Sequence, residues 1–121
     1  MTRFFAGLVL GFLASTLVLK AQRHENYKAV QPQSVLENQK VKIVRWVLKP
    51  GEGSPVHTHS LDHIGVTLRG STLRDIPAAG GAPTESEDKT GNVDFVPGKG
   101  QSHSFVNVGR TTFEAISIDL K

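Results

Sequence analysis

The sequence predicts an all-β domain, a small sandwich or barrel, and two observations carry this prediction. After residue 40 the chain consists of short runs rich in β-branched and aromatic residues, separated by Gly, Pro, Asn or Ser. No segment after residue 40 places apolar residues at helical spacing. Short strands punctuated by turns are typical of sandwiches and barrels, and a chain of 121 residues fills a single core.

Residues 1–21 are expected to be a secretory signal peptide or a signal-anchor. Arg3 precedes an uncharged, largely apolar stretch at 4–19, and a small residue, Ala21, offers a cleavage site. The length of this stretch lies between an apolar signal region of roughly 7–15 residues and a membrane span of roughly 17–25, so both alternatives stay open. We therefore expect the folded part in the periplasm or outside the cell, or anchored in the inner membrane by residues 4–19.

Charge and cysteine content exclude several classes of function. The net charge is +3, but 2 of the 14 Lys and Arg residues lie in 1–21, which leaves 12 against 11 acidic residues in the rest of the chain. These basic residues are scattered singly, so nucleic-acid binding is not expected. The chain has no cysteine, so it has no disulfide or thiolate chemistry, and a metal site must use His and carboxylates.

The elements follow in order along the chain. Residues 22–40 are polar and are expected to be a leader or linker with room for a short edge strand; the β-domain is expected to span 41–121. The breaker-rich stretch 77–91 is expected to be a mobile surface loop. Strands are expected at 41–48, 56–59, 63–70, 71–76, 92–97, 103–108 and 111–120.

Four of the five histidines lie in the strand region: His57, His59, His63 and His103. His57 and His59 are two residues apart, which on a strand puts both rings on one face with about 7 Å between their Cα atoms. A single histidine in a half-buried strand is more often a satisfied polar residue than a ligand. Four of them among turn glycines favour one shared metal site.

Two stretches around these histidines share a pattern of residue types and intervals. The first runs Gly51, five residues, His57-Thr58-His59, three residues, His63, six residues, Gly70; the second runs Gly91, five residues, Pro97, two residues, Gly100, two residues, His103, three residues, Asn107. In order and spacing they resemble the two motifs of the cupin family. The resemblance implies that 41–121 forms a small double-stranded β-helix, the cupin or jelly-roll barrel. Strand alternation from His103 puts Asn107 on the pocket side, and from its place at a strand end we expect a structural hydrogen-bonding residue and not a catalyst.

The resemblance also implies a divalent metal held inside the barrel by His57, His59 and His103. Cupins usually have Glu where this chain has His63, and the second motif is one residue longer here, through Gly98-Lys99. With His63 as fourth ligand the set is neutral and leaves the ion its full charge, which favours a small anionic or enolisable ligand. Imidazole ligands favour Fe, Ni, Cu or Zn over Mn. A metal-free barrel is the alternative, and Asp62, a possible replacement ligand, should point away from an inward His63.

Strand alternation extends the expected pocket beyond the ligands. From His63 it places Gly65, Thr67 and Arg69 inside, and Ile64, Val66 and Leu68 on the opposite face, against the outer sheet or a partner. Arg69 is expected either as a carboxylate clamp or as a solvated residue at the strand end. The substrate-pocket residues expected from these patterns are Thr67, Arg69, Phe105 and Trp46.

Three functions are compatible with these features. The first is an exported or membrane-tethered metal-binding cupin that acts on a small anionic or enolisable substrate as a dioxygenase or isomerase of Lewis-acid type. No residue is identified as its catalytic base. The second is a non-catalytic binding or stress-related domain with a structural metal, and the third is a membrane-tethered partner protein without a small-molecule site. The resemblance further suggests a homodimer.

Overall fold

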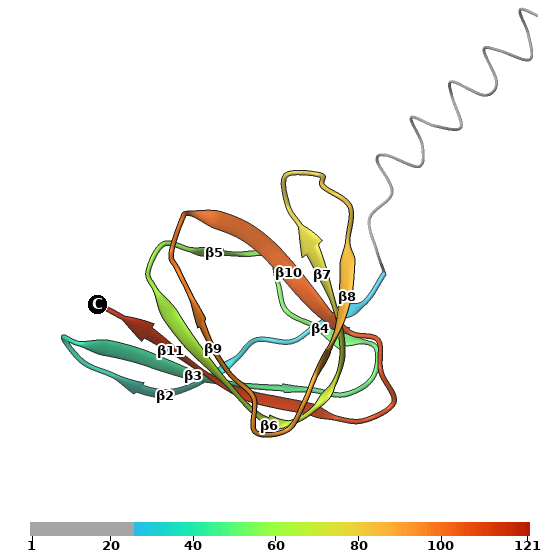
Figure 1. The fold of residues 1–121 in the computed structure, drawn as a ribbon, viewed down its shortest axis with the longest axis horizontal. Helices are drawn as coiled ribbons and strands as arrows, with labels where there is room; N and C mark the ends of the chain where they lie inside the picture. Colours follow the sequence, from blue (N-terminus) through green and yellow to red (C-terminus); the bar gives the residue numbers. More distant parts are fainter. Residues whose placement is uncertain (1–25) are drawn as a thin grey trace, which may run out of the picture.

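The computed structural model describes residues 26–121, in which all regular structure is β-strand. Two sheets enclose the interior, with β5 and β10 across from β3, β11 and β6 (Figure 1). The strands are β1 (Lys28–Ala29), β2 (Gln33–Glu37), β3 (Val41–Leu48), β4 (Glu52–Gly53), β5 (His57–His59), β6 (His63–Arg69), β7 (Ser71–Pro77), β8 (Thr84–Asp88), β9 (Val93–Val96), β10 (Gln101–Asn107) and β11 (Phe113–Leu120). No helix in residues 26–121 is long and apolar enough to cross a membrane.

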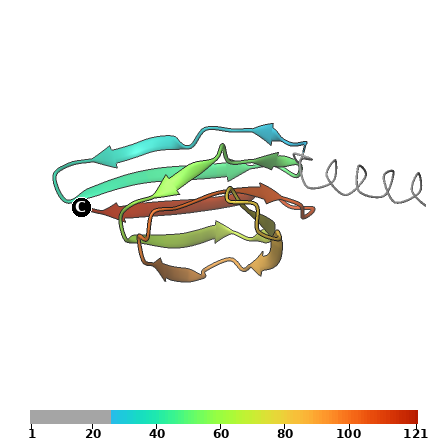
Figure 2. The same cartoon turned by 90° about the horizontal axis from the view of Figure 1, so that it is seen from above.

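The sheets are formed by strands that are distant in sequence. Sheet A has the order β1-β4-β10-β7-β8, with β5 also paired to β10. Sheet B has the order β2-β3-β11-β6-β9, and Figure 2 shows its long strands side by side. Each expected run from residue 41 onward contains a strand, so the all-β prediction is confirmed.

Two segments are more regular than expected. The polar stretch 22–40 contributes β1 and β2, and β2 is an edge strand of sheet B paired to β3. The stretch 77–91, expected as a loop, contains β8, which pairs with β7 over five residues. Edge strands bury little side-chain surface and so can be polar. The polar composition of these two segments therefore gave no sign of their strands. The signal or anchor predicted for residues 1–21 lies outside the described residues.

The hydrophobic core lies between the sheets. Sheet B contributes four of its buried side chains, and Leu73 of sheet A packs against them; the four are Trp46, Leu48, Phe113 and Ala115. Burying an aliphatic or aromatic side chain of this size contributes about 1.5–3 kcal/mol. Asn107, fully buried, joins the two sheets at this end by donating to the carbonyls of Leu48 and Thr111. This confirms the structural role expected for Asn107.

The inner face of sheet B changes from apolar to polar along its strands. At one end Trp46 and Ala115 stand beside Thr67, and all three are buried. The next inward row contains Val44, Ser117 and Gly65, and the last contains Lys42, Asp119 and His63. The apolar end stabilises the fold, and the polar end carries the chemically reactive side chains.

The outer face of sheet B carries a continuous apolar row that crosses all five strands. Cross-strand partners in this row, which we call the outer patch, are Leu36, Ile43, Ile118, Ile64 and Phe95. Its two ends are the most exposed, with Leu36 49% and Phe95 58% accessible. This arrangement confirms that Ile64 faces outward.

Arg69 was predicted to face the interior, but it faces outward. A β-bulge between β6 and β11 pairs Thr67 with Ala115 and Arg69 with Glu114, so that Leu68 is the extra residue and the alternation is reversed after it. Arg69 donates to the Glu114 carboxylate at 2.9 Å on the outer face, and Arg45 donates to the same carboxylate. Arg69 therefore lies outside the predicted pocket, and its side chain, 58% exposed, agrees with the alternative of a solvated residue at the strand end.

Candidate metal centre

The pairing of β5 with β10 brings three histidines together. His57 lies opposite His103, and His59 lies opposite Gln101, so the rings of His57, His59 and His103 share the inner face. Thr58, between the two β5 histidines, points to the other face, where its hydroxyl meets that of Ser102 at 2.6 Å. Residues separated by 44 positions in sequence thus form one cluster because two short strands pair in this register.

The Nε2 atoms of these three rings converge. His57 Nε2 lies 3.1 Å from that of His59 and 3.1 Å from that of His103, and the His59 and His103 atoms are 2.8 Å apart. Such a triangle of ring nitrogens is compatible with a bound metal ion.

The Nδ1 side of two rings fixes their tautomers. His57 Nδ1 donates to the carbonyl of Pro55 at 2.9 Å, and His103 Nδ1 donates to the Asp75 carboxylate. In a neutral ring the proton at Nδ1 leaves a lone pair at Nε2. The lone pairs of His57 and His103 therefore face each other at 3.1 Å, an arrangement that a cation stabilises.

Asp75 belongs to the candidate site and was not predicted from the sequence. It lies on β7 opposite Phe105, one inward position away from His103. Its carboxylate is in the place that acidic groups take behind metal-bound histidines, where they orient the ring. Its contact with His103 depends on the register of two strands about 30 residues apart in sequence, which no local pattern reveals.

The segment just before His57 is held in place by contacts at successive residues, Gly53 and Ser54. Ser54 donates its N–H to the Phe105 carbonyl at 2.8 Å, and the Phe105 N–H donates back to the Ser54 hydroxyl at 3.0 Å. The Tyr27 hydroxyl donates to the Ser54 carbonyl at 2.7 Å, and the Tyr27 ring occupies the space where a Cβ at Gly53 would stand. The segment that leads into His57 therefore has little freedom to move.

His63, predicted as the fourth ligand, lies beside the cluster and outside the convergent set. Its ring stacks on that of His59 with centroids 4.2 Å apart and planes at 19°. Its Nδ1 is buried and has no hydrogen-bond partner among the described residues. Asp62, the alternative ligand, accepts a hydrogen bond from the Gly98 N–H at 2.8 Å and so points to the loop that the longer second motif forms.

The aromatic residues predicted around the pocket lie against His57. Its ring centroid is 5.7 Å from those of Trp46 and Phe105, which contact each other edge to face at 5.0 Å. Trp46 is buried in the core and not at an open mouth. Thr67 is buried on the inner face of β6, two residues after Gly65 and four residues after His63.

Burial and the neighbouring rings favour the neutral forms of His57, His59 and His63. Burial and the neighbouring rings lower the pKa of His59 to about 4. Burial is also the main reason that the pKa values of His57 and His63 fall below the ordinary value. Neutral rings at neutral pH leave nitrogen lone pairs available to a metal.

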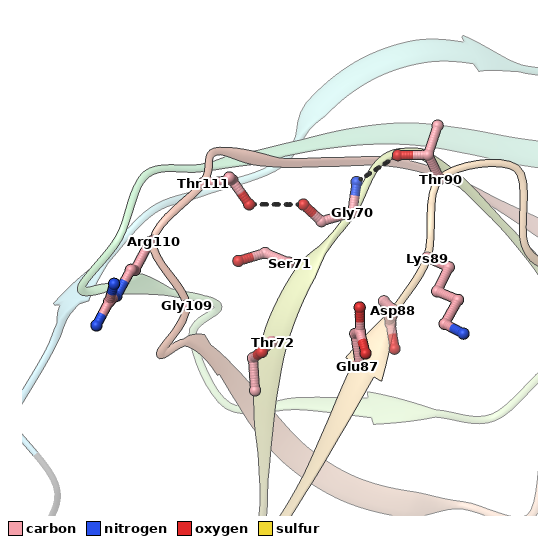
Figure 3. A pocket seen from close by; sticks show the side chains of 10 residues that line it. All are labelled: Gly70, Ser71, Thr72, Glu87, Asp88, Lys89, Thr90, Gly109, Arg110 and Thr111. Carbon is pink, nitrogen blue, oxygen red and sulfur yellow. Dashed lines mark hydrogen bonds between the residues drawn. The ribbon is translucent and has the colours of Figure 1, made fainter.

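A polar cavity of about 320 Å³ lies beside the start of β7 (Figure 3). The histidines are at the other end of this strand, where His103 lies opposite Pro77. Two of the hydroxyl groups that line the cavity form hydrogen bonds with Gly70 in the β6–β7 turn. The Thr90 hydroxyl accepts from the Gly70 N–H, and the Thr111 hydroxyl donates to the Gly70 carbonyl. A Cβ at Gly70 would lie 2.3 Å from the Asp88 carbonyl oxygen, so this turn requires glycine. We assign the cavity walls a structural role.

Known structures share this fold. A cupin domain from Bordetella pertussis matches with a TM-score of 0.69 and 25% identity over 82% of this chain and 99% of that one. An RmlC-like cupin family protein with a double-stranded β-helix fold from Methanocaldococcus jannaschii matches with a TM-score of 0.61 and 17% identity over 81% and 84%. A Klebsiella pneumoniae protein with a double-stranded β-helix domain gives a TM-score of 0.61 and 20% identity over 84% of each chain. No protein-family model and no curated protein matches the sequence. The chain has the cupin fold, and its histidine triad fits a cupin metal site.

The lowered histidine pKa values predict a stability that falls with acidification. Because the unfolded chain binds protons near pH 6.5 and folded His59 only near pH 4, the free energy of unfolding of the metal-free protein should decrease as pH falls from 6.5 toward 4 and level off above that range. Urea unfolding in the presence of a chelator measures this. In a His57→Ala/His59→Ala variant the free energy of unfolding should fall less steeply with decreasing pH. An equally steep fall would contradict the attribution of this pH dependence to the lowered pKa values of His57 and His59.

Proposed function

We propose that this protein is a metal-binding cupin-fold domain that holds one divalent ion through His57, His59 and His103. The observation that carries the proposal is the convergence of three Nε2 atoms within 3.1 Å, two of them lone pairs fixed from the Nδ1 side. With their protons at Nδ1, neutral rings of His57 and His103 present Nε2 lone pairs to each other, and a shared cation would remove this repulsion. This supports an ion at the point where the three rings converge.

The nitrogen separations also fit the usual bond length. For metal–nitrogen bonds of about 2.1 Å, nitrogens at these separations subtend angles near ~90° at the ion. Three ligands at such angles leave other coordination positions open, and imidazole donors suit Fe, Ni, Cu or Zn. We propose that a small oxygen-bearing, anionic or enolisable ligand binds at an open position. A bound ion would polarise its oxygens, as dioxygenase or Lewis-acid chemistry requires.

Metal titration tests the ion site. The full-length protein should bind one equivalent of Zn(II) or Ni(II), and His57→Ala or His103→Ala should weaken binding at least 100-fold because a ligand is lost. Asp75→Asn should weaken it by about 10–100-fold by removing the charge behind His103. Isothermal titration calorimetry measures these affinities.

Thr58→Ala is the matched control for this titration, because Thr58 stands between two ligands but faces away from them. Its affinity should equal that of the native protein. A native protein that binds no divalent metal would refute the proposed function.

We further propose that a second copy of this chain covers the outer patch. The patch takes one residue from each of five strands, and with strands about 4.8 Å apart and inward-outward repeats of about 6.6 Å this row covers roughly 160 Å² of sheet. It would form the apolar centre of an interface that extends over neighbouring residues toward the ~800 Å² that each partner of a stable dimer buries. A two-fold contact needs only one such face.

Phe95→Lys should convert the dimer to a monomer, because it places a charge in the most exposed part of the outer patch. Sedimentation velocity measures the mass. Thr72→Lys, on the outer face of sheet A, is the control and should stay dimeric. A native protein that is monomeric at high micromolar concentration would exclude this interface.

We also propose that residues 1–21 direct export, either as a cleaved signal or as an anchor. The support is the charged, apolar and small-residue layout of this segment. Cell fractionation should find the protein in the periplasm or the membrane, and a variant with Leu8, Leu10 and Leu13 changed to Arg should stay in the cytoplasm. Native protein found soluble in the cytoplasm would contradict export.

A further inference from the structure

The strand β1 lies beside the segment that leads to His57. It runs parallel to β4, with Ala29 opposite Gly53. The Val30 N–H donates to the Gly53 carbonyl at 2.8 Å, and the Val30 side chain packs against the core. This strand, expected from its composition to belong to a leader, is therefore fixed next to β4 and the start of the His57 segment.

Tyr27, just before β1, contacts the same segment with both its ring and its hydroxyl group. A Cβ at Gly53 would lie 2.7 Å from the ring, so the ring packs directly on the Gly53 backbone. The hydroxyl donates to the Ser54 carbonyl at 2.7 Å. Ser54 is completely buried, and a buried carbonyl that loses its hydrogen-bond partner raises the free energy of the folded state. The hydroxyl group therefore favours one orientation of this carbonyl.

The Ser54 carbonyl belongs to the peptide group that joins Ser54 to Pro55. A peptide group is planar, so fixing its oxygen also fixes the plane in which the Pro55 nitrogen lies. The proline ring restricts φ of Pro55 to about −65°, which leaves ψ as the free backbone angle that directs the Pro55 carbonyl. That carbonyl accepts a hydrogen bond from His57 Nδ1 at 2.9 Å. Tyr27 is thus connected to the His57 ring through one planar group and one restricted residue.

We propose that Tyr27 is a positioning residue of the metal centre, which orients the His57 ring through the Ser54–Pro55 peptide group. The proposal rests on the metal site proposed above. While the Pro55 carbonyl stays in place, His57 keeps its proton on Nδ1, and Nε2 keeps the lone pair that would bind the ion. Without the Tyr27 hydroxyl the carbonyl would vary in direction, and the ring would populate its other tautomer.

Zn(II) titration of full-length Tyr27→Phe by calorimetry tests the proposal, because this change removes the hydroxyl and keeps the ring on Gly53. We expect the affinity to fall by about 3–10-fold, less than for a group that bonds to a ligand directly. Ser71→Ala is the matched control. It removes another hydroxyl hydrogen bond of 2.7 Å, the buried one to Asn107, at the end of β7 away from His103, and should keep the native affinity.

The tautomer of His57 gives a second readout, which a loss of stability alone would not change. Nitrogen NMR of the metal-free native protein at neutral pH should show the His57 proton on Nδ1. In Tyr27→Phe the share of rings with the proton on Nε2 should rise by about 3-fold or more, because the hydrogen bond at one ring nitrogen sets the tautomer. Ser71→Ala should match the native protein.

The remaining outcomes separate this proposal from the metal site. A native tautomer and native Zn(II) affinity in Tyr27→Phe would overturn the role of Tyr27 and leave the metal site intact. An equal loss of affinity in Ser71→Ala would also overturn it, because general destabilisation would then explain both variants. A native protein that binds no Zn(II) would refute the metal site itself, and this inference with it.

Discussion

A single strand, β10, pairs on both of its sides, and the cluster of His57, His59 and His103 depends on this. Its beginning pairs with β5 and most of its length with β7, and His103 is the residue at which the two pairings overlap. From one side comes His57, whose Nε2 atom meets that of His103, and from the other comes Asp75, which holds the Nδ1 atom of the His103 ring. Ligands and their supporting groups are therefore ordered by the same backbone hydrogen bonds that build sheet A.

One part of the interior is the apolar core that stabilises the fold, and the other part is polar and adjoins the histidine cluster. Trp46 belongs to both parts, because it is buried in the core and its ring also lies against that of His57. Beyond it the inner face of sheet B becomes small and polar at Ser117 and Gly65 and charged at Asp119. A small domain can leave such a polar end unfilled because the apolar end already supplies a common core for both sheets.

Much of the fold and part of the candidate site could be predicted from the sequence. The strand runs are separated by strong turn signals, and the two-residue spacing of His57 and His59 fixes their common face whatever the rest of the chain does. Arg69 was misplaced because one bulged residue, Leu68, reverses the alternation, and a bulge depends on pairing with β11. Asp75 and the stacking of His63 on His59 depend on contacts between strands that no local pattern encodes.

The segment before His57 also bears on how easily this part of sheet A can open. Ser54 is bonded to Phe105 through both its backbone and its side chain, and Tyr27 closes over the same segment. Local opening of a protein is cheapest where few such bonds must break. Because this strand is tied into the middle of sheet A, fraying of the segment before His57 is unfavourable. The position of His57 is therefore set by the fold itself and does not depend on a bound partner.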